Sequence, residues 1–99
     1  MEVYVENCLK GNGQWLEVPQ SRECLMRELD ERHLSEDGEY QLTRIRITPF
    51  DIQECVGNLF VLNRKLYLYE KLTDEKKQEV MQYAWDEGIS FEDALYAFL

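Results

Sequence analysis

The sequence predicts an α+β fold, in which a small antiparallel three-stranded sheet with one helix is followed by a small helical bundle of about three helices. Two patterns lead to this prediction. In residues 1–50, apolar and polar side chains alternate over short runs, which is typical of half-buried strands. After residue 50, apolar residues recur every three or four positions, which is typical of amphipathic helices. The chain has 99 residues, 44% hydrophobic and 31% charged, a composition that suits a globular protein.

The three strands are expected at residues 2–9, 14–18 and 40–47. The first strand is rich in valine and tyrosine, which favour a pleated, half-buried surface. Asn12-Gly13 tolerates positive φ angles and predicts a tight hairpin between the first two strands. The third strand alternates clearly, and the pattern predicts two faces, one with Leu42, Arg44 and Arg46 and the other with Thr43, Ile45 and Ile47.

One helix is expected between the second and third strands. Ser21 fits as its N-cap, because a serine hydroxyl can accept a hydrogen bond from a free amide of the first turn. Leu25, Met26 and Leu29 keep helical spacing through about residue 33. His33 is expected near the C-terminal end of this helix, where a partial positive charge is favourable.

Three further helices are expected in the second half. Residues 58–71 carry an apolar stripe, and Thr73 and Ser90 fit as N-caps of the next two helices. Gly88 is a natural C-terminal stop for the middle helix. The inner face of that middle helix is expected to hold Val80, Met81, Ala84 and Trp85, and that of the last helix Phe91, Ala94, Leu95 and Phe98. The aromatic residues of these helices are therefore interpreted as core residues.

The change of pattern suggests two units, an α+β sheet unit at 1–50 and a helical unit at 51–99, or one compact domain that contains both. No strong strand pattern follows Pro49, so the joint is expected near residues 49–57.

The charge of the chain restricts its partners. Twenty acidic and 11 basic residues give a net charge of −9, with −4 in residues 1–50 and −5 in residues 51–99. Such acidity disfavours binding to nucleic acids and to anionic membranes, and it favours a basic protein surface. Three scattered cysteines, no secretory signal pattern and no long apolar run predict a cytoplasmic protein. The oligomeric state is left open.

No pattern indicates catalysis, a cofactor or a metal. The cysteine spacings and the single histidine match no zinc motif. Cys24 and His33 are nine residues apart on one expected helix, about half a turn out of phase, so they should face opposite ways. A pairing of His33 with Cys8 or Cys55 through the fold stays open. We expect that the protein is not an enzyme.

The candidate partner-binding residues are the acidic clusters. Caps and helix pairs explain part of this acidity, and an ordinary solvated surface is the alternative interpretation. The clusters comprise Glu28, Asp30, Glu31, Glu36, Asp37, Glu39, Asp74, Glu75, Glu79, Asp86, Glu87, Glu92 and Asp93.

The order of motifs resembles the N-terminal and central parts of ArdA-type antirestriction proteins. The resemblance is carried by VYVEN (3–7), GNG (11–13) and QWLEVP (14–19) in the first strands, by SEDGEYQL (35–42), by VLNRKLYLYEKL (61–72) with its Leu-Asn pair, and by ISFEDALYAFL (89–99). It covers nearly the whole chain, and the family's C-terminal domain has no counterpart in it.

The resemblance implies a function. ArdA-type proteins, often carried on mobile genetic elements, are DNA mimics that bind the DNA groove of type I restriction–modification enzymes. It therefore implies an antirestriction protein whose carboxylates stand in for phosphates. The alternative is a non-catalytic protein–protein interaction or regulatory accessory module on an ArdA-like scaffold, with contacts through exposed aromatics such as Tyr67 or Tyr96. A continuous acidic face would favour mimicry, and charges interrupted by Arg44, Arg46, Arg64 and Lys65 would favour the module.

Overall fold

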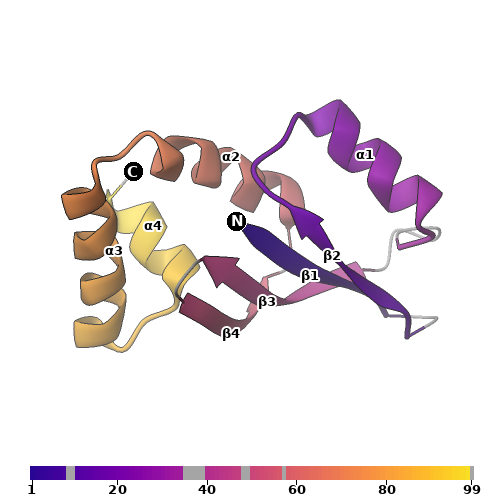
Figure 1. Cartoon of the computed structure of the whole chain (residues 1–99). Helices are drawn as coiled ribbons and strands as arrows, with labels where there is room; N and C mark the ends of the chain where they lie inside the picture. The colour runs from indigo at the N-terminus through magenta and orange to yellow at the C-terminus, as the bar shows by residue number, and fades with distance from the viewer. Residues whose placement is uncertain (9–10, 35–39, 48–49, 57, 99) are drawn as a thin grey trace.

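The computed structural model describes residues 1–8, 11–34, 40–47, 50–56 and 58–98 (Figure 1). In this part of the chain it contains four strands and four helices. In chain order they are β1 (Glu2–Asn7), β2 (Gly13–Glu17), α1 (Arg22–Glu31), β3 (Tyr40–Ile47), β4 (Phe50–Val56), α2 (Leu59–Glu70), α3 (Asp74–Glu87) and α4 (Phe91–Phe98). The predicted α+β class is confirmed. Of the described helices, none is long and apolar enough to span a membrane.

The sheet has four strands, in the order β2-β1-β3-β4, with every neighbouring pair antiparallel. The predicted number of three strands is wrong, because residues 50–56, expected at the joint, form β4. This segment, FDIQECV, has the strand-forming residues Phe50, Ile52 and Val56, but Asp51, Gln53 and Glu54 interrupt them. It pairs with β3, where Ile52 lies opposite Ile45 and Phe50 opposite Ile47. Pairing with β3 thus forms a strand that the interrupted local pattern indicates only weakly.

Strand β3 contains a bulge that changes which side chains are buried. Leu42, Ile45 and Ile47 are all buried, although Leu42 and Ile45 are an odd number of residues apart. Along both neighbouring strands the register skips Thr43, since Val5 and Tyr4 pair with Leu42 and Arg44. One extra residue turns the following side chains to the other face. The prediction that Leu42 shares a face with Arg44 and Arg46 is therefore wrong.

The hairpin between β1 and β2 forms as predicted, but with different turn geometry. Positive φ occurs at Gly11 (76°) and not at Asn12-Gly13. The backbone of Asn7 closes the turn, since its N–H donates to Asn12 O and its carbonyl accepts from Gly11 N, both at 2.8 Å. Gly13 opens β2, and a Cβ added there would lie 2.6 Å from the Tyr4 hydroxyl oxygen. Gly13 is therefore required for close packing against the Tyr4 ring.

The predicted helix caps are confirmed. The hydroxyls of Ser21, Thr73 and Ser90 accept hydrogen bonds from the backbone N–H of Cys24, Lys76 and Asp93 at 3.0–3.2 Å. Gly88 ends α3 in the left-handed conformation, with φ of 64°. His33 follows the end of α1 with φ of 55°, in agreement with its expected position.

One apolar core joins the sheet and the helices. In Figure 1, α1 and α2 lie on one side of the sheet, and α3 and α4 lie beyond the end where β3 and β4 meet. The predicted stripe of α2 is buried as Leu59, Leu62, Leu66 and Tyr69, and α4 contacts α2, α3 and β4. The core cluster includes residues from β1, β2, β3 and all four helices. The division into units 1–50 and 51–99 stays a prediction.

Candidate functional site

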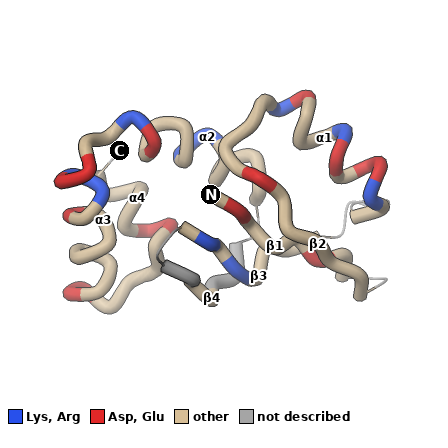
Figure 2. The backbone as a smooth tube through the Cα atoms, in the orientation of Figure 1, with Lys and Arg blue, Asp and Glu red and all other residues tan. Residues whose placement is uncertain are grey.

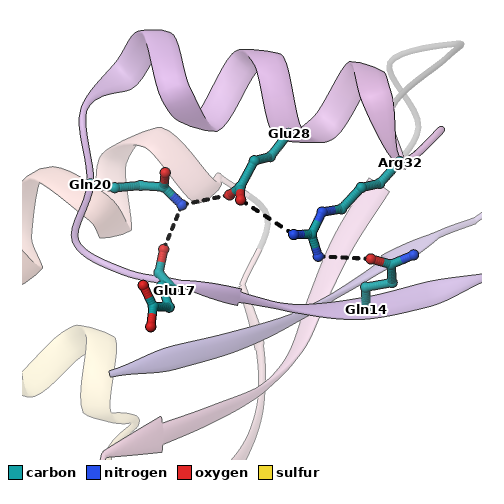
Figure 3. Close-up of polar contacts among 5 residues, drawn as sticks. All are labelled: Gln14, Glu17, Gln20, Glu28 and Arg32. Atoms are coloured by element: carbon teal, nitrogen blue, oxygen red, sulfur yellow. Dashed lines mark hydrogen bonds and ion pairs between the residues drawn. The ribbon is translucent and has the colours of Figure 1, made fainter.

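The acidic residues of α1 are partly used by the fold itself. Glu28 accepts a hydrogen bond from Gln20 Nε2 at 2.7 Å through Oε2, and its Oε1 lies 3.4 Å from Arg32 Nη2 (Figure 3). Gln20 Nε2 also donates to the carbonyl of Glu17 at 2.7 Å, and Arg32 Nη1 donates to Gln14 Oε1 at 2.8 Å. This network attaches α1 to β2, so Glu28 has a structural role.

The acidic residues of α3 and α4 are mostly exposed. Asp74 and Glu75 lie in the first turn of α3, where the helix dipole favours them. Three others have polar neighbours, since Glu79 lies 3.2 Å from Lys76 Nζ, Asp86 accepts from Gln82 at 2.8 Å, and Glu92 lies 3.9 Å from Lys65 Nζ. These contacts are long or solvent-exposed and leave most of the negative charge on the surface.

The acidic clusters of the described helices lie in two groups, one on α1 and one on α3 and α4. Figure 2 shows α1, with Asp30 and Glu31 exposed near its end, on the opposite side of the molecule from α3 and α4. The two arginines of β3, Arg44 and Arg46, lie between the groups. The structure thus brings together the carboxylates of α3 and α4 and separates them from those of α1. Glu36, Asp37 and Glu39 lie outside the described residues.

The C-terminal group is the more strongly acidic one. Residues 78–99 contain five acidic residues and no Lys, Arg or His. Most of this segment forms the second half of α3 and the whole of α4. Because cations come near it only from elsewhere in the chain, as with Lys65 beside Glu92, this end of the molecule attracts cationic groups.

A groove lies within this acidic end. Its volume is about 770 Å³. One wall belongs to α3, the other to β4, and the connection to α4 completes the groove. The lining residues are Ile52, Gln53, Gln78, Met81, Gln82, Ala84, Trp85, Ile89, Ser90 and Phe91. All ten are apolar or uncharged, while Glu79, Asp86 and Glu87 belong to the same helix as one wall.

Trp85 is the residue of this groove that sequence reasoning placed wrongly. It is 83% exposed, although its spacing predicted a core position. Val80 is the residue of α3 that is fully buried. Trp85 follows it by five residues, which places Trp85 about 140° around the helix from Val80. Because α3 packs through a narrow stripe, Trp85 lies outside it. The signal of an exposed position in the sequence was that two acidic residues, Asp86 and Glu87, directly follow Trp85.

Some of the other aromatic residues are buried as predicted, and others are exposed. Tyr69 and Phe91 are buried and meet edge to face with ring centroids 5.6 Å apart, and burial raises the pKa of the Tyr69 hydroxyl. Tyr67 and Tyr96, the candidate contact residues, are exposed as expected, Tyr96 by 76%. Phe98, predicted to be in the core, is partly exposed and packs against Tyr83 at 5.4 Å.

The uncovered face of the sheet carries the arginines of β3. The Arg46 guanidinium lies 3.9 Å from the centre of the Trp15 ring, and its Nη1 lies 3.6 Å from Glu2 Oε1. Trp15 also meets the Tyr4 ring edge to face at 5.4 Å. The Trp15 ring and the Glu2 carboxylate therefore already contact the Arg46 guanidinium. For this reason, this face of the sheet is less suited to binding an anion.

The possible thiol site is not formed in the described residues. Asn7 Nδ2 donates to the carbonyl of His33 at 3.0 Å, so the segments of Cys8 and His33 are neighbours. Among the described cysteines, Cys8 and Cys24 are free thiols and exposed. The Cys55 side chain is not described. Within the described part of the chain, no group of three or more His, Cys, Asp or Glu could hold a metal ion.

Comparisons with models of protein families, with curated proteins and with solved structures find no match to this chain.

Proposed function

We propose that the protein is a non-catalytic protein–protein interaction module that binds the basic surface of a partner through α3 and α4. One observation carries this proposal: an exposed tryptophan and one wall of an apolar groove lie in residues 78–99, which have five acidic residues and no basic one. Aromatic residues at the centre of a contact supply affinity, while complementary charge increases the rate of encounter and selects the partner. This combination suits recognition of a cationic protein.

The arrangement of charge supports a contact limited to α3 and α4 over a contact that extends along the whole molecule. A mimic of DNA needs many carboxylates on one face, since DNA carries one charge per about 1.7 Å of its axis. Here the two acidic groups lie at opposite ends, with Arg44 and Arg46 between them. A contact at α3 and α4 alone needs no such continuity. The free thiols of Cys8 and Cys24 suit the reducing cytoplasm, where we propose that the module acts.

The test compares two matched pairs of substitutions. Both α1 and α3 end in the dipeptide Asp-Glu, at Asp30-Glu31 and Asp86-Glu87, and all four residues are exposed. Reversal of either pair to lysine changes the net charge from −9 to −5. We expect D86K/E87K to weaken binding of the cellular partner by about tenfold. The D30K/E31K protein should bind within about twofold of the original.

The measurement uses a photoreactive amino acid in place of Gln82, which lines the groove. Cross-linking in cells identifies the partner, and titration of that purified partner gives the dissociation constants. An equal loss of affinity in the two variants would show that only net charge matters and that α3 is not the contact. A partner without a cluster of Lys or Arg at the cross-linked position would also contradict the proposal.

The second candidate function is ArdA-like antirestriction, in which the acidic surface occupies the DNA groove of a type I restriction–modification enzyme. The five acidic residues of positions 78–99, which include no basic residue, favour it, together with the order of sequence motifs. The direct test is electrophoretic competition between the protein and DNA for a type I methyltransferase complex at modest salt. Mimicry requires displacement of DNA that weakens steeply as salt increases, and a failure of excess protein to displace DNA would exclude it for that enzyme.

A further inference from the structure

We propose that the groove between α3 and β4 is the docking site for an amphipathic helix of the partner, with apolar residues on one face and Lys or Arg along one margin. This inference rests on the proposed function and specifies the chemistry and the conformation of the partner segment. The bound helix would lie along α3, with its apolar side chains in the groove beside Trp85 and its cationic side chains on the side of Glu79 and Asp86.

The wall that α3 presents has the spacing of a helix-binding surface. Gln78, Met81, Gln82 and Trp85 all line the groove. They follow one another at intervals of three, one and three residues, so they form a single stripe along two turns of the helix. This stripe is about 10 Å long at 1.5 Å per residue. A partner helix can place its own side chains, repeated at the same intervals, along such a stripe.

The opposite wall and the base of the groove supply apolar contacts. Ile52 and Gln53 come from β4, and Ile89 and Phe91 come from the connection and the first turn of α4. Phe91 is held in place by the edge-to-face contact with Tyr69. Trp85, 83% exposed, lines the groove opposite these residues and offers its indole ring to a partner segment.

Charge complementarity determines which amphipathic helix fits. Glu79, Asp86 and Glu87 are exposed residues of α3. At 100° per residue, Glu79 and Asp86 lie about a quarter turn to one side of the groove stripe, whereas Glu87 faces away from it. The nearest basic residues of α3 in sequence, Lys76 and Lys77, lie in its first turn, where Lys76 pairs with Glu79 and Lys77 lies over the Tyr69 ring. A helix with acidic side chains on the side of Glu79 and Asp86 would be repelled, whereas Lys or Arg there meets the carboxylates of these two residues.

A helix fits this site better than an enclosed small molecule or an added strand. Small-molecule sites bury most of their ligand, but the wall residue Trp85 is 83% exposed, so the groove is open. Strand β4 pairs with β3 alone among the described strands and offers a free edge. Backbone pairing at that edge would not use the α3 stripe or Trp85. Of these occupants, only one that lies against α3 would contact both the groove and Trp85.

The experiment uses two synthetic peptides of the same composition, each made of leucine and lysine. The first repeats LKKLLKL, which is amphipathic as a helix, and the second repeats LKLKLKL, which is amphipathic as a strand. The chain has two tryptophans, so the variant Trp15→Phe leaves Trp85 as the one fluorescent indole. Titration of the full chain carrying this substitution follows the emission of Trp85 directly, and calorimetry gives the dissociation constants.

We expect the helical peptide to bind more tightly than the strand peptide and to shift the Trp85 emission to shorter wavelength. Trp85→Ala should weaken its binding by about tenfold, as truncation of an aromatic anchor does. Because Trp85 is so exposed, this substitution should leave the fold intact. The matched control is Met26→Ala, which removes an exposed apolar side chain from α1, away from the groove. It should leave the affinity unchanged.

Three outcomes would overturn the inference. Equal binding of both peptides would show that leucine–lysine peptides bind by charge alone. Tighter binding of the strand peptide would assign the site to the edge of β4. An affinity that is independent of Trp85 would show that the groove is not used. If the cellular partner depends on Asp86-Glu87 and not on Trp85, the proposed function stands while this inference falls.

Discussion

Asn63 connects α2 to the segment between β2 and α1 through both ends of its side-chain amide. Its Oδ1 accepts from Gln20 N at 3.0 Å, and its Nδ2 donates to Gln20 O at 2.8 Å. The side chain is 5% exposed, so little water can replace these two bonds. The Leu-Asn pair that contributed to the family resemblance therefore has a structural reason: Leu62 enters the core, and Asn63 holds a distant loop.

Replacement of Asn63 by alanine should destabilise the protein by about 2 kcal/mol, because the backbone N–H and C=O of Gln20 both lose their partner. Urea unfolding followed by circular dichroism measures the change. Asn12→Ala is the control, since the side chain of Asn12 is exposed and only its carbonyl closes the hairpin. The control should change stability by less than about 0.5 kcal/mol. A similarly small effect of Asn63→Ala would contradict a structural role.

At the scale of elements, the position of the groove depends on how α3 ends. The backbone N–H of Gly88 donates to Trp85 O at 3.3 Å, and that of Ile89 to Ala84 O at 3.1 Å. The left-handed turn at Gly88 then directs the chain into α4, and Ile89 and Ser90 line the groove beside Trp85. A helix that continued through residue 88 would separate these residues from the α3 wall.

Gly88→Ala should reduce stability by about 1 kcal/mol, because an L residue is strained at a φ of 64°. Nothing lies within 4 Å of a Cβ added at this position, so the cost is that of the backbone alone. Asparagine adopts the left-handed conformation more readily, and Gly88→Asn should cost less. Thermal unfolding of the two variants tests this order. Equal losses would indicate that the backbone conformation is not the cause.

At the scale of the whole molecule, the two acidic groups repel one another along its longest axis. The molecule measures 38 × 25 × 21 Å. The Debye length is about 30 Å at 10 mM ionic strength and about 10 Å at 100 mM. The groups at opposite ends therefore interact at low salt and are screened at moderate salt. A net charge of −9 on a chain of 99 residues makes this repulsion a general cost of folding.

An increase in sodium chloride from about 10 mM to about 100 mM should therefore raise the melting temperature by a few degrees. Differential scanning calorimetry at constant pH measures it. The D30K/E31K and D86K/E87K variants, each with a net charge of −5, should show a smaller increase. A melting temperature that falls with salt would mean that attractive ion pairs outweigh the repulsion.

The sequence by itself determined the features that depend on near neighbours in the chain. The caps at Ser21, Thr73 and Ser90 and the stop at Gly88 were predictable, because each acts within one helical turn. The buried stripe of α2 was predictable, because helical periodicity is a local property. The acidity that indicates a basic partner was also visible in the sequence. These features placed the helices but not the surface between them.

Only the tertiary structure decided where the site lies. Strand β4 exists because β3 offers it a partner, and the bulge at Thr43 appears only when the neighbouring strands set the register. Trp85 is exposed because α3 packs through a stripe narrower than its apolar residues suggest. The groove needs all of these together, with β4 on one side and α3 on the other. Burial depends on contacts between distant segments, and local patterns do not contain that information.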